Sequence, residues 1–270
     1  WLAAPLVAQA NIMDLLGRLD EAARLGEAAR KVQPEDGAVI DLQLSIYSQQ
    51  GQWDKIRLML QRRELSLNPV SAAGLTYAEA LLRLKHPEQA RALLSKALII
   101  APDNRYARMM LAEAQLATGD APAALATLRP LVDGVFVYPR EFELAEQAAI
   151  AAGDPLAAAL RAQRQSGEFK RRSALIERGL AATAQSDWAA ALQAWQQLQR
   201  LGEDAELLRR IADCASLSGS HALAIASADK AAALQPGDAE LLNLAGAVRL
   251  AAGLDLGRAR ALLEAAVERA

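Results

Sequence analysis

The sequence predicts an all-α protein made of repeated helix pairs, and two observations support that prediction. The apolar fraction is 53% while aromatic residues make up only 4%, so a core must be built mainly from Ala and Leu. These two residues also have the highest helix propensities, whereas the sparse Val, Ile and Thr argue against sheets. The second observation is a set of glycines that recurs every 34 residues or a multiple close to it: Gly17, Gly51, Gly119, Gly153, Gly219 and Gly253.

The glycine interval divides the chain into eight units. The two glycine places that the series skips hold Lys85 and Ser186. We place the units near residues 3–36, 37–70, 71–104, 105–138, 139–171, 172–204, 205–238 and 239–270. No change of composition marks a domain boundary, so we expect a single array. The phase is weakest in the two 33-residue units between Pro139 and Asp204.

The first unit shows why each unit should form helix, turn and helix. Leu6, Ala10 and Met13 recur at helical spacing, and Gly17 can end that helix because glycine tolerates a positive φ. Pro34 then stops the second helix, since proline cannot continue one. Between them, Asp20 and Glu21 favour a helix start, and a stripe of small residues faces the first helix: Ala22, Gly26 and Ala29.

The later units repeat these signals in order. A small residue follows five places after the glycine place, at Ala90, Ala124, Ala158, Ala191 and Ala224. Proline closes several units, at Pro69, Pro102 and Pro236. A single helix pair cannot bury its own apolar stripe, so successive pairs are expected to stack into a continuous core.

The pattern resembles the tetratricopeptide repeat family over nearly the whole chain. That family has a small residue in the first helix, an aromatic after the Leu-Gly turn, and an Ala-x-x-x-Phe element in 34 residues. Trp53 and Trp188 match the aromatic place, and Ala191 to Trp195 matches the last element. Leu44 and Glu146 depart from the small-residue place, which puts the helix packing of the second and fifth units in doubt. The resemblance implies a right-handed superhelical solenoid of antiparallel helix pairs.

The resemblance also implies a concave groove lined by first helices, which binds a peptide or protein segment. Mapping the groove places onto this chain gives Asp41, Ser45, Gln49, Glu79, Arg83, Tyr106, Met109, Glu113, Arg140, Glu143, Gln147, Arg209 and Asp213. Apolar contacts flanked by mixed charge suit an extended or helical peptide. Some relatives hold a carboxylate with Lys and Asn at fixed places, but here those places hold Asp41, Leu75, Met109, Glu143 and Arg209. That carboxylate clamp is therefore absent.

The segment from Leu131 to Phe142 is unusually rich in Val, aromatics and Pro. We expect Pro130 to shorten the preceding helix and the chain from Gly134 onward to cross as a loop. Phe136 and Tyr138 are then candidates for a specialised contact, either at the seam between the fourth and fifth units or exposed beside the groove. Phe142 falls at an aromatic packing place. The basic run from Glu168 to Arg172 is expected to be a solvated turn.

No catalytic, metal-binding or cofactor-binding motif occurs in the sequence, so we expect a protein that is not an enzyme. His86 and His221 are the only histidines, and no Cys, His or carboxylate cluster has ligand spacing. Cys214 is the single cysteine and is expected to be a buried small apolar residue. The formal net charge of −2 gives no reason to expect nucleic acid as a partner, and no apolar run is long enough to insert into a membrane.

The leading hypothesis is a non-catalytic scaffold or adaptor that binds a protein partner. The alternative is part of a larger assembly: the periplasmic region of a bacterial polysaccharide or envelope export protein, or the substrate-presenting region of an enzyme. Self-association through apolar faces of the end repeats is a third hypothesis. The Ala- and Arg-rich composition suggests a bacterial source, in either cytoplasm or periplasm, with no targeting signal in this chain.

Overall fold

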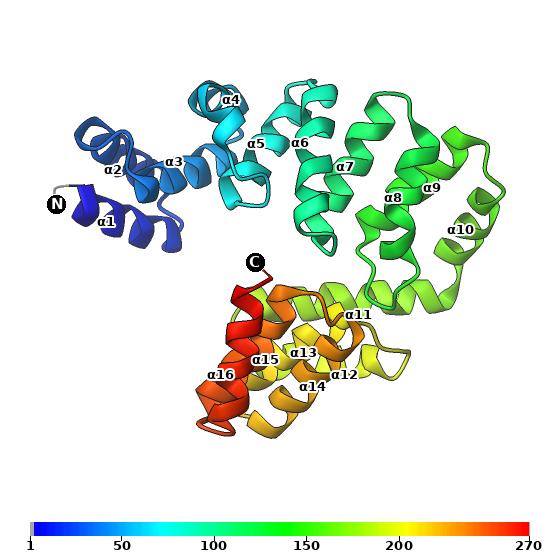
Figure 1. Cartoon of the computed structure of the whole chain (residues 1–270). Coiled ribbons are helices and arrows are strands. Elements are labelled where there is room, and N and C mark those ends of the chain that lie inside the picture. Colours follow the sequence, from blue (N-terminus) through cyan, green and yellow to red (C-terminus); the bar gives the residue numbers. More distant parts are fainter. Residues whose placement is uncertain (1–2, 270) are drawn as a thin grey trace. The chain divides into compact units, whose positions relative to one another are not determined.

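The computed structural model describes residues 3–269, and this part of the chain is all-helical, with sixteen α-helices, one short 3₁₀ helix and no strand. The chain divides into two compact units, Trp1–Asp120 and Ala121–Ala270. The first unit contains α1 (Ala3–Leu15), α2 (Leu19–Val32), α3 (Gly37–Gln49), α4 (Trp53–Leu60), η1 (Gln61–Ser66), α5 (Ala72–Arg83), α6 (Pro87–Ile100) and α7 (Arg105–Ala117) (Figure 1).

The second unit begins with the second helix of the fourth sequence repeat. It contains α8 (Ala121–Val132), α9 (Pro139–Ala152), α10 (Leu156–Gln165), α11 (Gly167–Ala184), α12 (Trp188–Gln199), α13 (Ala205–Leu217), α14 (His221–Leu234), α15 (Ala239–Ala252) and α16 (Leu256–Val267). Within each unit, helices that follow one another in sequence pack side by side. The fourth repeat is thus divided between the two compact units.

The turn between the two helices of each repeat contains one residue in the left-handed region. Six of the eight turns use the recurring glycines, with φ between 66° and 83°. Lys85 and Ser186, which stand where glycine is skipped, adopt the same conformation with φ of 62° and 57°. The period of 34 residues therefore reflects one backbone geometry that the turn requires, and glycine meets it with the least strain.

Side-chain caps determine where most first helices begin. Asp36 accepts a hydrogen bond from the backbone N–H of Val39, and Ser71 accepts one from that of Gly74. Further first helices are capped in this way by Asn104, Ser166, Asp204 and Asp238, and Asp187 caps the second helix α12. Each cap satisfies a backbone donor that the first turn of a helix leaves without a partner.

In the first unit, small residues allow helices to approach closely. Ala22, Gly26 and Ala29 of α2 are all buried, as the stripe in the sequence predicts. Farther along, Tyr77, Leu81, Leu94 and Met110 belong to one buried cluster. This core holds α3 to α7 together.

In the second unit, the largest buried side chain is Trp195. Its indole lies over Gly179 of α11, where a Cβ atom would come within 2.3 Å of the ring. Glycine at this place is required because it makes room for the indole. Trp195, which ends the Ala-x-x-x-Phe element, is fully buried, whereas Trp188 at the aromatic place of the repeat is only half-buried.

Glu146, which replaces a small residue in α9, is buried and paired. Its carboxylate forms ion pairs with Arg161 at 3.1 Å and with Arg164 at 2.8 Å, both on α10. Phe142, one turn earlier, is fully buried and lies 4.5 Å, between ring centroids, from Phe169 of α11. The fifth repeat therefore has ion pairs at a place where most other repeats have alanine or glycine, and an aromatic pair one turn earlier.

Two expectations about this region are wrong. Pro130 does not shorten α8, which runs on to Val132, because the following N–H groups still find partners and Asp133 N bonds to Arg129 O at 3.2 Å. The sixth first helix, α11, begins at Gly167 rather than at Arg172. Ser166 caps it by accepting from Phe169 N at 3.1 Å, so the basic run from Glu168 to Arg172 is helical rather than a turn.

Candidate functional site

The first helices of the first unit are joined by polar contacts along one face. Gln49 of α3 donates to Asp14 of α1 at 3.0 Å and to Ser45 at 3.2 Å. Tyr106 of α7 donates its hydroxyl to Glu79 of α5 at 2.8 Å. These bonds bring predicted groove residues into contact in two places, Gln49 with Ser45 on α3 and Glu79 of α5 with Tyr106 of α7.

Glu79 also forms an ion pair with Arg83 at 3.1 Å, and the Arg83 guanidinium lies 5.8 Å from the ring centroid of Trp53. Burial, together with the hydrogen bond to Glu79, raises the pKa of Tyr106. The phenol therefore remains a hydrogen-bond donor at any physiological pH. Of the other predicted residues on this unit, Asp41 is exposed, and Met109 and Glu113 are half-buried.

In the second unit the predicted residues fall into two separate groups. Arg140, Glu143 and Gln147 are exposed on α9. Arg209 and Asp213 lie on α13, joined by an ion pair of 3.4 Å. The structure therefore brings Arg209 and Asp213 together, but no contact joins them to Glu143 or Gln147.

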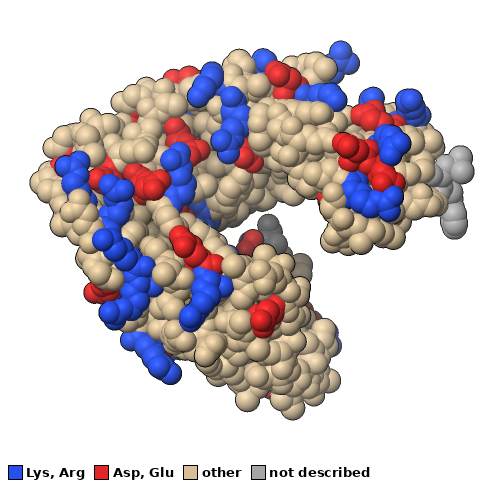
Figure 2. Space-filling model, turned by 180° about the vertical axis from the view of Figure 1, so that it is seen from behind, with Lys and Arg blue, Asp and Glu red and all other residues tan. Residues whose placement is uncertain are grey.

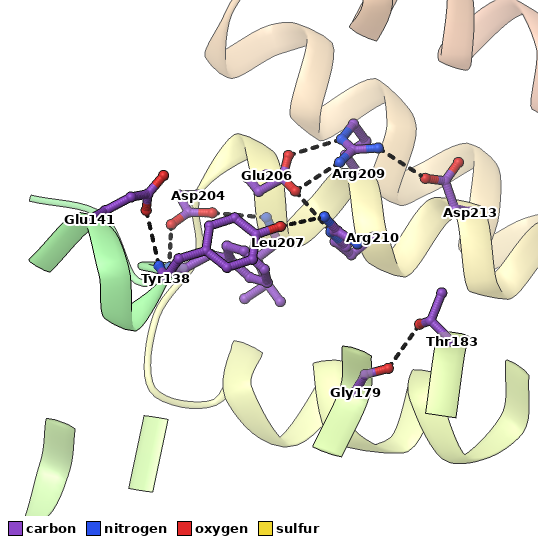
Figure 3. A network of polar contacts seen from close by, with 11 residues as sticks. Tyr138, Glu141, Gly179, Thr183, Asp204, Glu206, Leu207, Arg209, Arg210 and Asp213 are labelled. Atoms are coloured by element: carbon purple, nitrogen blue, oxygen red, sulfur yellow. Dashed lines mark hydrogen bonds and ion pairs between the residues drawn. The ribbon is translucent and has the colours of Figure 1, made fainter. Parts of the chain in front are cut away.

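A network of four charged residues runs along α13 (Figure 3). Glu206 accepts from Arg209 at 2.7 Å and from Arg210 at 2.8 Å, and Arg210 donates to the Tyr138 hydroxyl at 2.6 Å. Burial acts to raise the pKa of Glu206, but the two guanidinium groups outweigh it and hold that pKa below its usual value. Burial raises the pKa of Asp213, which Arg209 offsets only in part.

The loop of residues 133–138 docks on this network. Asp204, the cap of α13, accepts from the backbone N–H of Val135 at 2.7 Å and of Phe136 at 2.6 Å, and from that of Leu207 at 2.8 Å. A single carboxylate thus begins a helix and holds a loop nearly seventy residues earlier in the chain. Gly134 and Gly202 lie at this junction, where little space remains.

Phe136 and Tyr138 occupy a different place from either sequence expectation. Phe136 is fully buried, with its ring centroid 5.7 Å from that of Trp195 and 5.0 Å from that of Tyr138. The Arg210 guanidinium lies 5.4 Å from the centroid of the Phe136 ring. The two aromatics therefore join the loop to α12 and α13, rather than filling a seam between neighbouring repeats or standing exposed.

A pocket of about 440 Å³ opens beside this network, and we call it the α13 pocket. It is lined by Thr183 of α11, Trp188 of α12, five residues of α13 and four of α15: Arg210, Asp213, Cys214, Ser216, Leu217, Leu244, Ala247, Val248 and Ala251. Among the groove residues mapped from the sequence, Asp213 lies in its wall. Sequence reasoning missed the α15 wall, although Leu244, Ala247 and Ala251 share a helix face and two of them are small.

The α13 pocket offers recognition chemistry rather than bond-making chemistry. Burial raises the pKa of the Cys214 thiol, so the residue is a poor nucleophile. In the described residues 3–269, no group of three or more His, Cys, Asp or Glu side chains could hold a metal ion. Nor does any described helix have the length and apolarity that crossing a membrane requires.

Charged side chains of both signs are interspersed over the face drawn in Figure 2. Within the described chain, several charged side chains pair inside their own helix, as Arg172 does with Glu168 and Arg260 with Glu264.

Comparison with known proteins finds one family match, and it covers part of the chain. Residues 81–133 match the sequence profile of the tetratricopeptide repeat. No curated protein sequence is significantly similar to the chain. Among solved structures, a tetratricopeptide repeat protein from Parabacteroides merdae is 17% identical, over 98% of both chains, with a TM-score of 0.39.

Two further solved structures are similar at the same identity of 17%. The TPR2AB domain of yeast Sti1, solved as a complex with pHSP90, aligns over 99% of this chain and 90% of its own, with a TM-score of 0.33. The APC/C hetero-tetramer Cut9–Hcn1 aligns over 98% of this chain, which spans 52% of the matched chain, with a TM-score of 0.37. The match at residues 81–133 covers α6, α7 and α8 with the turn between them.

Proposed function

We propose that this chain, which carries the tetratricopeptide repeat at residues 81–133, is a non-catalytic scaffold that binds a protein partner through its first helices. The repeat fold supports protein–protein interaction in general. The observation that carries the proposal for this chain is the α13 pocket, an apolar recess with a polar wall on three successive first helices. Pockets of this volume and lining recognise ligand side chains.

The face of the first unit offers a second contact area. Tyr106 is 43% exposed although its hydroxyl is fixed by Glu79, so the ring is presented in one orientation. A rigid, partly exposed tyrosine costs little conformational entropy when a partner covers it, which is why tyrosine is frequent among residues that dominate binding energy. Each unit therefore has its own candidate contact for a partner.

The test begins with partner identification by cross-linking and mass spectrometry in native cells. The partner is then titrated against the wild type, Tyr106→Ala in the first unit and Ala247→Trp in the α13 pocket. We expect at least one variant to weaken binding about tenfold, the loss typical of a dominant contact residue. Equal affinity for the wild type and both variants would rule out these two surfaces, and turnover of the partner would rule out a non-catalytic role.

A further inference from the structure

The α13 pocket has an apolar interior and a polar wall. Trp188, Leu217, Leu244 and Val248 give it an apolar interior, and Ala247 and Ala251 leave its α15 side open. Its volume of about 440 Å³ lies at the lower end of the usual range for ligand pockets, roughly 300–1,000 Å³. Space of this size suits one bulky side chain and part of its neighbour.

The polar wall has unused hydrogen-bonding capacity at Asp213. Arg210 is held in place, because its Nε bonds to Glu206, one Nη donates to the Tyr138 hydroxyl, and its guanidinium lies against the Phe136 ring. Asp213, in contrast, accepts one long bond of 3.4 Å from Arg209, which itself bonds more closely to Glu206. An ionised carboxylate can accept about four hydrogen bonds, so Asp213 can still accept from a ligand.

The same contacts favour a positively charged ligand group over a negative one. Asp213 is the one carboxylate in the pocket wall and can accept from a basic group, while the one cation in the wall, Arg210, already donates to Glu206 and to the Tyr138 hydroxyl. Burial and the nearby Glu206 charge together raise the pKa of Asp213 more than Arg209 and Arg210 lower it, and a basic ligand group beside Asp213 would favour its ionised form. Ser216, one turn farther along α13, adds a hydroxyl to the pocket wall.

We propose that the α13 pocket binds a partner segment in which a bulky apolar side chain stands next to a Lys or Arg. The apolar side chain lies against Trp188 and Leu244, and the basic group bonds to Asp213. This inference rests on the proposed function and adds to it the class of sequence that is recognised.

The experiment selects random displayed peptides on the whole chain and titrates the selected peptides. The first variant, Asp213→Asn, removes the charge and keeps the shape of the side chain. The second, Ala247→Trp, fills the pocket from an exposed position on α15, and Ala251→Trp repeats this one turn later. Glu177→Gln, an exposed carboxylate of α11 outside the pocket, is the matched control for loss of charge. Circular dichroism and thermal unfolding verify that each variant is folded.

We expect the selected peptides to share an apolar residue beside Lys or Arg. Asp213→Asn should weaken their binding about fivefold, as for loss of a partly exposed ion pair, and the tryptophan variants by more than tenfold. Glu177→Gln should leave the dissociation constant within about twofold.

Peptides that bind both tryptophan variants as well as the wild type would overturn the pocket while leaving the scaffold function in place. Peptides that need the pocket but lack a basic residue, and that bind Asp213→Asn unchanged, would overturn the charge preference. A selection that yields no binding peptide would contradict the proposed function, and it would contradict this inference as well.

Discussion

Lys85 and Ser186 occupy a backbone conformation that six of their equivalents fill with glycine. A left-handed conformation costs a residue with a side chain roughly 1 kcal/mol in the folded protein. Glycine avoids this cost, but it loses more conformational entropy on folding, which offsets part of the gain. We therefore expect Lys85→Gly and Ser186→Gly each to stabilise the protein by about 0.5 kcal/mol. Chemical denaturation with circular dichroism measures the change.

Lys96→Gly is the matched control, because Lys96 is an exposed residue inside α6. In a helix interior the same substitution should destabilise by about 1 kcal/mol. If both lysine substitutions shifted stability in the same direction, the left-handed turn would not be the cause.

Gly179 should tolerate no side chain at all. A Cβ atom there would lie 2.3 to 2.5 Å from three carbons of the Trp195 ring, and the indole is fully buried and cannot withdraw. Gly179→Ala should thus cost about 3 kcal/mol of stability despite the better helix propensity of alanine. Gly167→Ala at the start of the same helix meets no atom within 4 Å and should be neutral or slightly stabilising. Equal effects of the two substitutions would contradict the clash.

Glu206 gives the α13 network a predictable pH dependence. Its pKa in the folded protein is lowered, so it adds stability above its unfolded pKa of about 4.3, which is lost as the pH falls through the folded value. The stability difference between wild type and Glu206→Gln should therefore be largest near pH 7 and should shrink below pH 4. The pKa of Asp213 shifts in the opposite direction, and because the Glu206 charge contributes to that shift, it should be smaller in Glu206→Gln. A difference that stays constant from pH 7 to pH 3 would contradict the assignment.

At the scale of elements, Asp204 is the residue that joins the 133–138 loop to α13. Asp204→Ala removes a helix cap and two charge-assisted bonds to backbone N–H groups, with an expected cost of about 3 kcal/mol. Asp204→Ser keeps the cap but is too short to hold both loop amides, so it should cost less. Hydrogen exchange of the Val135 and Phe136 amides should accelerate in both variants. Protection that persisted in Asp204→Ala would show that the aromatic contacts alone hold the loop.

Helices whose bounds depend on nearby residue types could be predicted from the sequence. The glycine period, the small-residue stripes and the closing prolines indicate helix pairs, and the structure confirms an all-helical chain. The start of α11 could not be predicted in this way, because Ser166 caps it five residues ahead of the repeat phase. The repeat pattern and the Ser166 cap favour different starting residues for α11, and the helix starts where the cap places it.

The candidate site was less accessible to sequence reasoning. Asp213 was found because it occupies a repeat place, whereas the contact of Phe136 with Trp195 joins residues 59 positions apart, outside the scope of any period of 34. The docking of Phe136 depends on Gly202 and Asp204, which leave room for the loop and bind its amides. Such contacts arise from tertiary packing, which single-sequence patterns do not encode.

At the scale of the whole molecule, the sequence predicts a single array. That the eight repeats unfold as one cooperative unit remains a hypothesis. The described chain forms two compact units, and clusters of buried residues lie within each. Stability in a repeat array is close to a sum of local terms, because each helix pair contacts mainly its neighbours. A substitution in one unit need not unfold the other, and one free energy of unfolding would then not describe the protein.

We accordingly expect the two units to respond separately to core substitutions. Gly179→Ala should lower the unfolding temperature of the second unit, and Leu81→Ala, a fully buried site, should lower that of the first by removing about 2–5 kcal/mol. Fluorotryptophan incorporation with ¹⁹F NMR would follow Trp53 in the first unit and Trp195 in the second during one thermal scan. Each substitution should shift the loss of only its own unit's native signal. Simultaneous loss of both signals in both variants would show instead that the eight repeats unfold as a single cooperative array.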